Sequence, residues 1–311
     1  MIKNVLITGI NGFVGSNLYN FYSKKFQLFG LDVFNNNDLI SSNKFYYWNG
    51  LHNIPDVDII IHLAGKAHDI KNTSSEQEYF DVNVGLTKKI FQHFLKSSAS
   101  KFIFFSSVKA VADSISDEIL TEEMLPNPQT PYGKSKLQAE QYILSMHLPP
   151  EKRVYILRPC MIHGPGNKGN LNLLYKLTKK GLPWPLGAFD NKRSFTSMQN
   201  LQFVIQEFIE KDIESGTYQI ADDETLSTNE LICLIADSLD KKAHIWNISP
   251  NMIKLIAKTG DKLGLPLNTE RLKKLTESYI VSNQKLKKTL GIEKMPHTAA
   301  EGMKKTFSSF L

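Results

Sequence analysis

Cysteine is scarce in this sequence, and long apolar runs are absent from it. The 311 residues include only two cysteines, Cys160 and Cys233, which excludes a disulfide framework and a cysteine-rich zinc site. No stretch approaches the roughly 18 uninterrupted apolar residues of a membrane helix. The first fifteen residues are also unlike a signal peptide, because polar residues such as Asn4 and Thr8 interrupt their apolar run. We therefore expect a soluble, cytoplasmic protein without membrane insertion.

Most of the chain has no excess of positive charge, and the excess is concentrated in residues 241–311. The net charge is +6, but residues 241–311 carry fourteen Lys and Arg against five Asp and Glu. Such a segment either attracts phosphate-bearing ligands or nucleic acid, or consists of solvated helix faces such as 285–288. The aromatic and basic elements that read nucleic acid are not evident, so we expect no nucleic-acid partner.

Apolar runs alternate with helical patterns along the first half of the chain. The predicted strands are 5–8, 27–33, 57–63, 101–106, 153–157 and 216–221, and the predicted helices are 14–22, 79–96 and 131–146. This alternation predicts an α/β fold with a doubly wound parallel sheet. From 227 onward the sequence predicts short basic helices around one strand at 244–248, in a smaller, mostly helical C-terminal domain.

A glycine-rich turn separates the first strand from the first helix. Gly9, Gly12 and Gly15 form a GxxGxxG pattern, which suits a tight turn that brings backbone close to a pyrophosphate at a helix N-terminus. Asp32 ends the second strand, and no Arg or Lys follows it directly. A carboxylate there accepts hydrogen bonds from ribose hydroxyls and repels a 2′-phosphate, so the sequence favours NAD over NADP. The alternative for Asp32 is a simple turn residue.

Together with four further motifs, this turn resembles the extended short-chain dehydrogenase/reductases, the NAD-dependent epimerase/dehydratase family. The further motifs are Ile61-His62-Leu63-Ala64-Gly65, Phe104-Phe105-Ser106-Ser107, Tyr132-Gly133-Lys134-Ser135-Lys136 and Leu157-Arg158-Pro159, in the family's order and spacing. The resemblance implies a Rossmann domain for NAD over 1–165 and about 195–225. It implies a nucleotide-sugar domain over 166–194 and 226–311.

Tyr132 and Lys136 are four residues apart on a predicted helix opened by Pro131, and therefore share one face. A phenol with a pKa near ~10 is a poor base at neutral pH, and a nearby ammonium lowers that pKa. Ser107 ends a predicted strand at the sheet edge where parallel-sheet active sites lie, so it is placed to donate to the reacting oxygen. We predict these three residues to be catalytic; the alternative is a chance YxxxK on a helix.

The resemblance implies further site residues. Those expected to bind the cofactor, beside the glycines, Asp32, Tyr132 and Lys136, are Asn11, Phe13, Val14, Leu63, Ala64, Gly65, Lys66 and Asn83. Arg193 matches an arginine that clamps the diphosphate of a sugar nucleotide, with Asn170, Arg271 and Ser107 as further substrate contacts. His68 either lies near the sugar or is a solvated histidine. For Asn83 and Arg193 the alternatives are a helix-surface residue and an exposed loop cation. Histidines and carboxylates do not cluster at metal-ligand spacing, so we expect no metal.

The sequence departs from the family at two places. Many relatives carry an aspartate near position 49, where this chain has Trp48-Asn49-Gly50, and 4,6-dehydratases carry Asp-Glu where this chain has Val108-Lys109. Valine transfers no proton, so we predict no dehydration.

The first expectation for function is a 4-epimerase of a UDP-hexose or UDP-N-acetylhexosamine. The alternatives are a reductase of a UDP-4-keto-6-deoxy sugar and a non-catalytic NAD-sensing regulator. The resemblance also implies a homodimer through helices 79–96 and 131–146, for which Phe91, Phe94, Leu95 and Ile143 offer apolar positions.

Overall fold

A parallel sheet forms the centre of the molecule in the computed structural model, which describes residues 2–36, 39–67, 75–115, 118–167, 169–264 and 267–310. Within these residues the sheet has seven strands in the order β10-β7-β5-β4-β1-β2-β3, every neighbouring pair parallel. The strands are β1 Asn4–Thr8, β2 Gln27–Asp32, β3 Phe45–Tyr47, β4 Ile59–His62, β5 Lys101–Phe105, β7 Arg153–Pro159 and β10 Gly216–Ile220. The predicted doubly wound α/β fold is confirmed.

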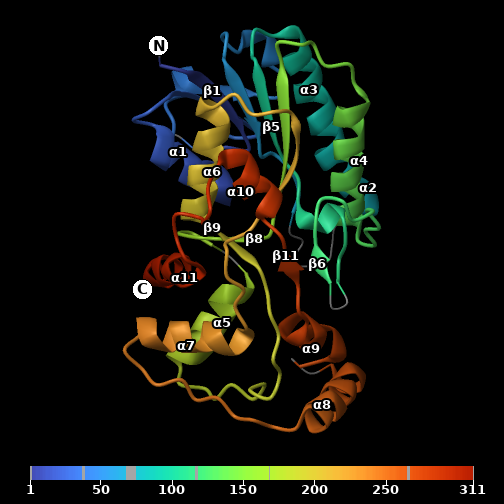
Figure 1. The fold of residues 1–311 in the computed structure, drawn as a ribbon, viewed down its shortest axis with the longest axis vertical. Helices are drawn as coiled ribbons and strands as arrows, with labels where there is room; N and C mark the ends of the chain where they lie inside the picture. Colours follow the sequence, from blue (N-terminus) through green and yellow to red (C-terminus); the bar gives the residue numbers. More distant parts are fainter. Residues whose placement is uncertain are drawn as a thin grey trace.

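Helices cover both faces of this sheet (Figure 1). One face carries α1 Phe13–Tyr22 and α6 Met198–Glu210, and the other carries α3 Leu86–Lys96 and α4 Pro131–Ser145. Alternate residues of a strand point to opposite faces, so Val5 and Ile7 enter one apolar core while Leu6 enters the other. Strands buried on both faces explain the continuous apolar runs of the sequence.

The remaining elements lie mainly beyond the carboxyl ends of the strands (Figure 1). These elements are α5 Asn170–Lys179, α7 Thr228–Ser238, α8 Pro250–Leu263, α9 Thr269–Thr276, α11 Ala299–Ser308 and the short pairs β8 Met161–His163 with β9 Phe195–Ser197 and β6 Ile119–Leu120 with β11 Ile280–Val281. Most of the helices share a second apolar core. By contrast, α10 Gln284–Leu290 packs its two buried leucines into the core of the main sheet.

Two predicted elements differ from the structure. The helix predicted over 79–96 is divided into α2 Glu76–Phe80, a π-helical turn Asp81–Gly85 and α3. The strand predicted over 244–248 is reduced to two isolated bridges, Trp184 with Ile245 and Leu186 with Asn247. Its partner segment contains Pro183 and Pro185, which lack the N–H groups that a continuous ladder requires.

The apolar residues proposed for a dimer interface belong to the core of this chain. Phe91, Phe94 and Ile143 are at most 3% exposed and pack with residues of the sheet. An amphipathic helix that covers a sheet buries its apolar stripe against that sheet. The interpretation of these three positions as support for a dimer was therefore wrong.

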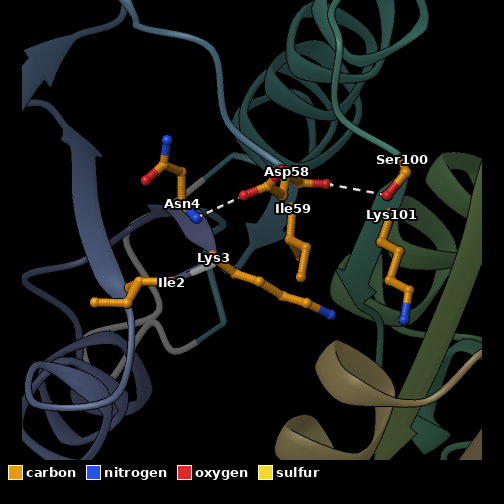
Figure 2. Close-up of a pocket in the computed structure, with 7 residues that line it drawn as sticks. All are labelled: Ile2, Lys3, Asn4, Asp58, Ile59, Ser100 and Lys101. Atoms are coloured by element: carbon orange, nitrogen blue, oxygen red, sulfur yellow. Dashed lines mark hydrogen bonds between the residues drawn. The ribbon is translucent and has the colours of Figure 1, made fainter.

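The amino edge of the sheet carries a shallow depression lined by two lysines (Figure 2). Lys101 Nζ donates to the carbonyl oxygens of Phe208 and Ile209, both at 3.0 Å, and Lys3 Nζ donates to Ile209 at 2.6 Å. Ammonium groups at a helix C-terminus satisfy its free carbonyls and oppose its dipole. These lysines therefore anchor the end of α6, on the edge opposite the expected nucleotide site.

A buried ion pair joins α4 to β7. Arg158 donates from Nε to Glu140 Oε1 at 2.9 Å and from Nη2 to Oε2 at 2.5 Å, and Ser106 Oγ donates to the same carboxylate. Glu140 is 1% exposed and Arg158 is 6% exposed. A bidentate pair with a further hydrogen bond offsets the cost of burying both charges.

Replacing one partner of this pair leaves the other charge buried alone. We expect Arg158→Met to lower the free energy of unfolding by about 3–5 kcal/mol, the usual cost of breaking a buried pair. Urea denaturation measures the change, with Glu270→Gln as the control because its pair with Lys274 is exposed. A loss for Arg158→Met no larger than that for the control would contradict this interpretation.

Candidate active site at the carboxyl edge of the sheet

The glycine turn follows β1 and leads directly into α1. Gly9 has a positive φ of 69°, a conformation that favours glycine. A Cβ on Gly15 would lie 2.4 Å from the Gly9 carbonyl oxygen, so the helix approaches the turn more closely than a side chain permits. Gly12 is the N-cap of α1, and the first turn of the helix contains no acidic residue. The arrangement offers backbone N–H groups and a helix dipole to an anion.

Asp32 lies at the end of β2, beside this turn. Its Oδ2 accepts from the Asn11 backbone N–H at 3.0 Å, and its Oδ1 accepts from Val33 at 2.8 Å. Asn11 Nδ2 donates to the Phe34 carbonyl at 2.6 Å, whereas Asn11 Oδ1 is buried and has no hydrogen-bond partner among the described residues. A partly exposed carboxylate and an unsatisfied amide oxygen fit a ligand that brings hydroxyl or amino donors, as a dinucleotide does.

The turn after β4 packs directly on the glycine turn. A Cβ on Gly9 would lie 2.8 Å from both Ala64 N and Ala64 Cα, and Ala64 N–H donates to Thr8 Oγ1 at 3.1 Å. Leu63 N–H donates to the Thr8 carbonyl at 3.2 Å. The predicted cofactor residues Leu63 and Ala64 are thus brought against Gly9.

His62 joins β4 to β1 and α3 through its ring nitrogens, a role that the sequence analysis did not predict. The fully buried ring lies 2.7 Å (Nδ1) from Thr8 Oγ1 and 3.0 Å (Nε2) from Thr87 Oγ1. Thr87 donates its own hydrogen to the Asn83 carbonyl, so His62 must donate from Nε2 and accept at Nδ1. Burial, aided by the Lys136 charge, lowers the pKa of His62 well below its usual value. A neutral ring suits this network.

Asn83 connects the turn after β4 to α4. Its Oδ1 accepts from the Lys66 backbone N–H at 2.7 Å, and its Nδ2 donates to Ser135 Oγ at 2.8 Å. Asn83 is completely buried, so the surface alternative for it is excluded. The Lys66 ammonium forms an ion pair with Glu78, and a Cβ on Gly65 would lie 2.8 Å from Asn83 Oδ1.

Tyr132 lies in the first turn of α4, which Thr130 caps by accepting from Gly133 N–H. Burial raises the pKa of Tyr132 above its usual value, and a hydrogen bond with the Ser107 side chain opposes this rise. Ser107 caps the 3₁₀ turn Val108–Ala110 after β5. The structure therefore brings Tyr132 and Ser107 together, as the sequence predicts.

Lys136 lies one turn further along α4, and its side chain is buried. Its Nζ donates to the Phe105 carbonyl at 2.8 Å, and a Cβ on Gly65 would lie 3.2 Å from Nζ. Burial lowers the pKa of Lys136 to about 8, while the charge of Glu140 raises it. Lys136 Nζ thus lies beside Gly65, in the turn after β4.

Arg193 lies where the C-terminal elements meet the main domain. Its backbone forms bridges with Leu226 and Tyr279, and its guanidinium donates to the Lys274 carbonyl. Arg193 is half-buried, and burial lowers the pKa of its guanidinium. The Lys109 ammonium lies 4.4 Å from the centre of the Tyr279 ring; burial lowers the pKa of Lys109, and the Arg193 charge lowers it further. Tyr279 Oη donates to the Ala112 carbonyl oxygen at 2.7 Å, in the segment that follows Ser107.

Two other expected substrate contacts belong to helices of the C-terminal part of the chain. Arg271 is exposed on α9, the helix whose Lys274 carbonyl Arg193 binds. Asn170 begins α5, but its side chain lies outside the described part of the structure, as does His68. Within the described ranges, no group of three or more His, Cys, Asp or Glu is placed to bind a metal, and no helix is long and apolar enough to cross a membrane.

Residues 5–221 match the model of the NAD dependent epimerase/dehydratase family. The chain belongs to this family. It is an NAD-dependent enzyme, and the NAD cofactor expected from the sequence is confirmed. The assignment of individual residues to NAD and to substrate stays a prediction.

Relatives of known activity align with most of the chain. The UDP-glucose 4-epimerase of Vibrio cholerae is 29% identical, with 100% of this chain and 96% of the relative covered. An Escherichia coli O157:H7 enzyme, N-acetyl-alpha-D-glucosaminyl-diphospho-ditrans,octacis-undecaprenol 4-epimerase, is 29% identical, with 78% and 74% covered.

Solved structures share the fold. Bordetella bronchiseptica WbmG in complex with NAD and UDP superposes with a TM-score of 0.77 at 16% identity, covering 100% of this chain and 95% of the other. The UDP-glucuronic acid 4-epimerase from Bacillus cereus in complex with NAD gives a TM-score of 0.75 at 19% identity, with 98% of both chains covered.

We expect Asp32 to set the preference for NAD. Asp32→Ala removes an acceptor for ribose hydroxyls and the repulsion of a 2′-phosphate, so NAD affinity should fall roughly ten- to hundredfold and NADP affinity less. Calorimetric titration with both cofactors measures the difference. Asp58→Ala is the matched control, because Asp58 Oδ2 likewise accepts a backbone N–H, from Asn4 at 2.7 Å, but at the opposite edge (Figure 2). Equal losses for NAD and NADP would contradict the role of Asp32.

Proposed function

We propose that this enzyme is a 4-epimerase of a UDP-hexose or UDP-N-acetylhexosamine. The observation that carries the proposal is the hydrogen bond of Tyr132 with Ser107. Lys136 binds the carbonyl at the end of the strand that precedes Ser107, and Arg193 is joined through Tyr279 to the segment that follows it. A proton acceptor next to the cofactor site and a cation for a diphosphate are what reversible oxidation at C4 of a sugar nucleotide requires.

In this proposal side chains of the enzyme transfer the proton of the sugar 4-hydroxyl and orient the sugar. Bound NAD supplies the redox chemistry at C4. Tyr132 Oη removes the proton of the sugar 4-hydroxyl and later returns it, while Ser107 Oγ holds the same oxygen. Because burial raises the pKa of Tyr132, the phenolate needs a nearby cation, and we assign this role to Lys136, one turn further along α4.

Binding of the substrate is assigned to the boundary between the sheet and the C-terminal elements. We infer that Arg193 contacts the diphosphate through its planar guanidinium, with Arg271 and Asn170 as further contacts. The domain limits of 1–165 with about 195–225, and of 166–194 with 226–311, are proposed on the same basis. The second apolar core supports this division, although α10 packs with the main sheet.

A reductase of a UDP-4-keto-6-deoxy sugar would use the same Tyr132, Ser107 and Lys136, and it is the second candidate. The Vibrio cholerae relative, aligned along the whole chain, favours epimerisation. A non-catalytic NAD sensor would have no need for the hydrogen bond of Tyr132 with Ser107.

Two groups are candidates for the carrier that is linked to C1 of the sugar, UDP and a polyprenol diphosphate. One relative acts on UDP-glucose, and another acts on a sugar joined by a diphosphate to a polyprenol. Both carriers place a diphosphate at C1, and Arg193 suits either of them. UDP is our first choice, because the relative with the UDP-linked substrate aligns with the entire chain.

The most direct test of function is product analysis. Incubated with UDP-glucose or UDP-N-acetylglucosamine, the purified enzyme should form the C4 epimer with unchanged mass. Dehydration is not expected, since Val108 and Lys109 follow Ser107, and Asp113 accepts from Gln129 N–H at 2.6 Å and Thr130 N–H at 3.0 Å. Mass spectrometry and NMR identify the product. A product lighter by one water molecule, or turnover only of a 4-keto sugar with added NADH, would contradict the proposal.

Tyr132→Phe should keep the fold and the bound NAD but lower kcat by ~10²–10⁴-fold, the usual contribution of general acid–base catalysis. Tyr142→Phe is the matched control, because it removes a partly buried phenol from the same helix, where it accepts from Gln92 at 3.2 Å. Steady-state kinetics at saturating substrate measure both. A near-normal kcat for Tyr132→Phe would exclude the proposed role.

We also propose a homodimer through the outer faces of α3 and α4. Leu144, which is 65% exposed on α4, is an apolar residue available for such an interface. Sedimentation velocity should show a dimer that Leu144→Glu weakens, since a charge would then be buried in the interface. A monomer at every concentration tested would contradict this proposal.

A further inference from the structure

Helix α8 presents an apolar stripe to the surface of the molecule. Met252, Leu255, Ile256 and Leu263 are 55%, 66%, 43% and 68% exposed. Their spacing of three, four and seven residues places them along one side of the helix. Ile253, Ala257 and Gly260 are buried and form a neighbouring side of the helix, centred roughly 100° around the axis from the apolar stripe. The exposed stripe is therefore not the side by which α8 packs on its own chain.

A second stripe, of lysines, runs beside the apolar one. Lys254, Lys258 and Lys262 are exposed and four residues apart, so they follow one line along α8. At 100° per residue, Lys262 lies directly next to Leu255. The exposed surface of the helix thus carries an apolar stripe, which Thr259 interrupts, beside a cationic stripe, with Asp261 next to Lys254.

This arrangement fits the interface of a lipid bilayer. A helix that lies in the plane of a membrane buries its apolar residues between acyl chains and places lysines at the headgroups, where their aliphatic stems extend toward water. The basic character of residues 241–311 adds attraction toward an anionic surface. We propose that the outer face of α8 binds anionic phospholipid membranes.

The contacts of α8 connect this surface to the candidate active site. Gly260 of α8 packs so closely on the segment before α9 that a Cβ there would lie 2.0 Å from the Leu267 carbonyl oxygen. At the end of α9, the Lys274 carbonyl accepts from Arg193. Figure 1 shows α8 at the end of the molecule farthest from the amino edge of the sheet. Docking through α8 would bring the C-terminal elements, to which the proposed function assigns the substrate, to the headgroup layer.

Co-sedimentation with vesicles tests the proposal on the full-length protein. Wild-type protein should sediment with vesicles of equimolar phosphatidylglycerol and phosphatidylcholine, and much less with phosphatidylcholine alone. The double variant Leu255→Gln/Leu263→Gln and the triple variant Lys254→Gln/Lys258→Gln/Lys262→Gln should each bind the anionic vesicles about tenfold or more weakly.

Two control variants match these changes elsewhere on the surface. Leu125→Gln alters a leucine that is 87% exposed, and Lys24→Gln/Lys25→Gln/Lys96→Gln removes the same charge from exposed positions outside residues 241–311. Both controls should bind vesicles like the wild type. Equal loss in the controls, or no binding of the wild type to anionic vesicles, would overturn the proposal.

Two further measurements separate the alternatives. If the apolar variant converts a dimer to a monomer in the absence of vesicles, α8 is a protein interface and the proposal is wrong. Turnover of a soluble UDP-sugar without vesicles should be the same for the wild type and the α8 variants. If the wild type binds vesicles but turns over no UDP-sugar, the proposed function fails for that substrate while membrane binding stands.

Discussion

The parallel register of β1, β4 and β5 is the constraint on which the site depends. Thr8 pairs with His62, and His62 pairs with Phe104, so the three strands end at one level. The turns that follow them therefore start side by side. The first contains Gly9, the second packs Ala64 against it, and the third brings Ser107 to Tyr132. A shift of one residue in this register would move each turn away from the others.

Buried polar groups also stabilise the carboxyl edge of the sheet. His62 joins β1 and β4 to α3, Asn83 joins the turn after β4 to α4, and Lys136 binds the carbonyl of Phe105 at the end of β5. Burial of these groups would be costly without partners. Further along α4, Glu140 balances Arg158, and its charge opposes the lowering of the Lys136 pKa by burial. The same network therefore both positions the residues of the site and stabilises the fold.

Local patterns in the sequence were sufficient for most of the sheet and for the three proposed catalytic residues. Apolar strands, the glycine turn and the spacing of Tyr132 from Lys136 each depend on neighbouring residues. Two kinds of feature could not be predicted in this way. Glu140 and Arg158 are partners only because α4 crosses β7, and the strand expected at 244–248 failed because its partner segment contains two prolines. The outward apolar stripe of α8 likewise emerges only when its buried side is known.

The central claim is that one edge of the sheet holds NAD and a sugar so that C4 is oxidised and reduced again without release. A UDP-sugar with deuterium at C4 tests it, by NMR and mass spectrometry of the epimer formed in ordinary water. The account predicts that the product keeps its deuterium at C4, because the label leaves and returns within one closed site. Loss of the label to solvent, or inversion with the label at another carbon, would contradict the account.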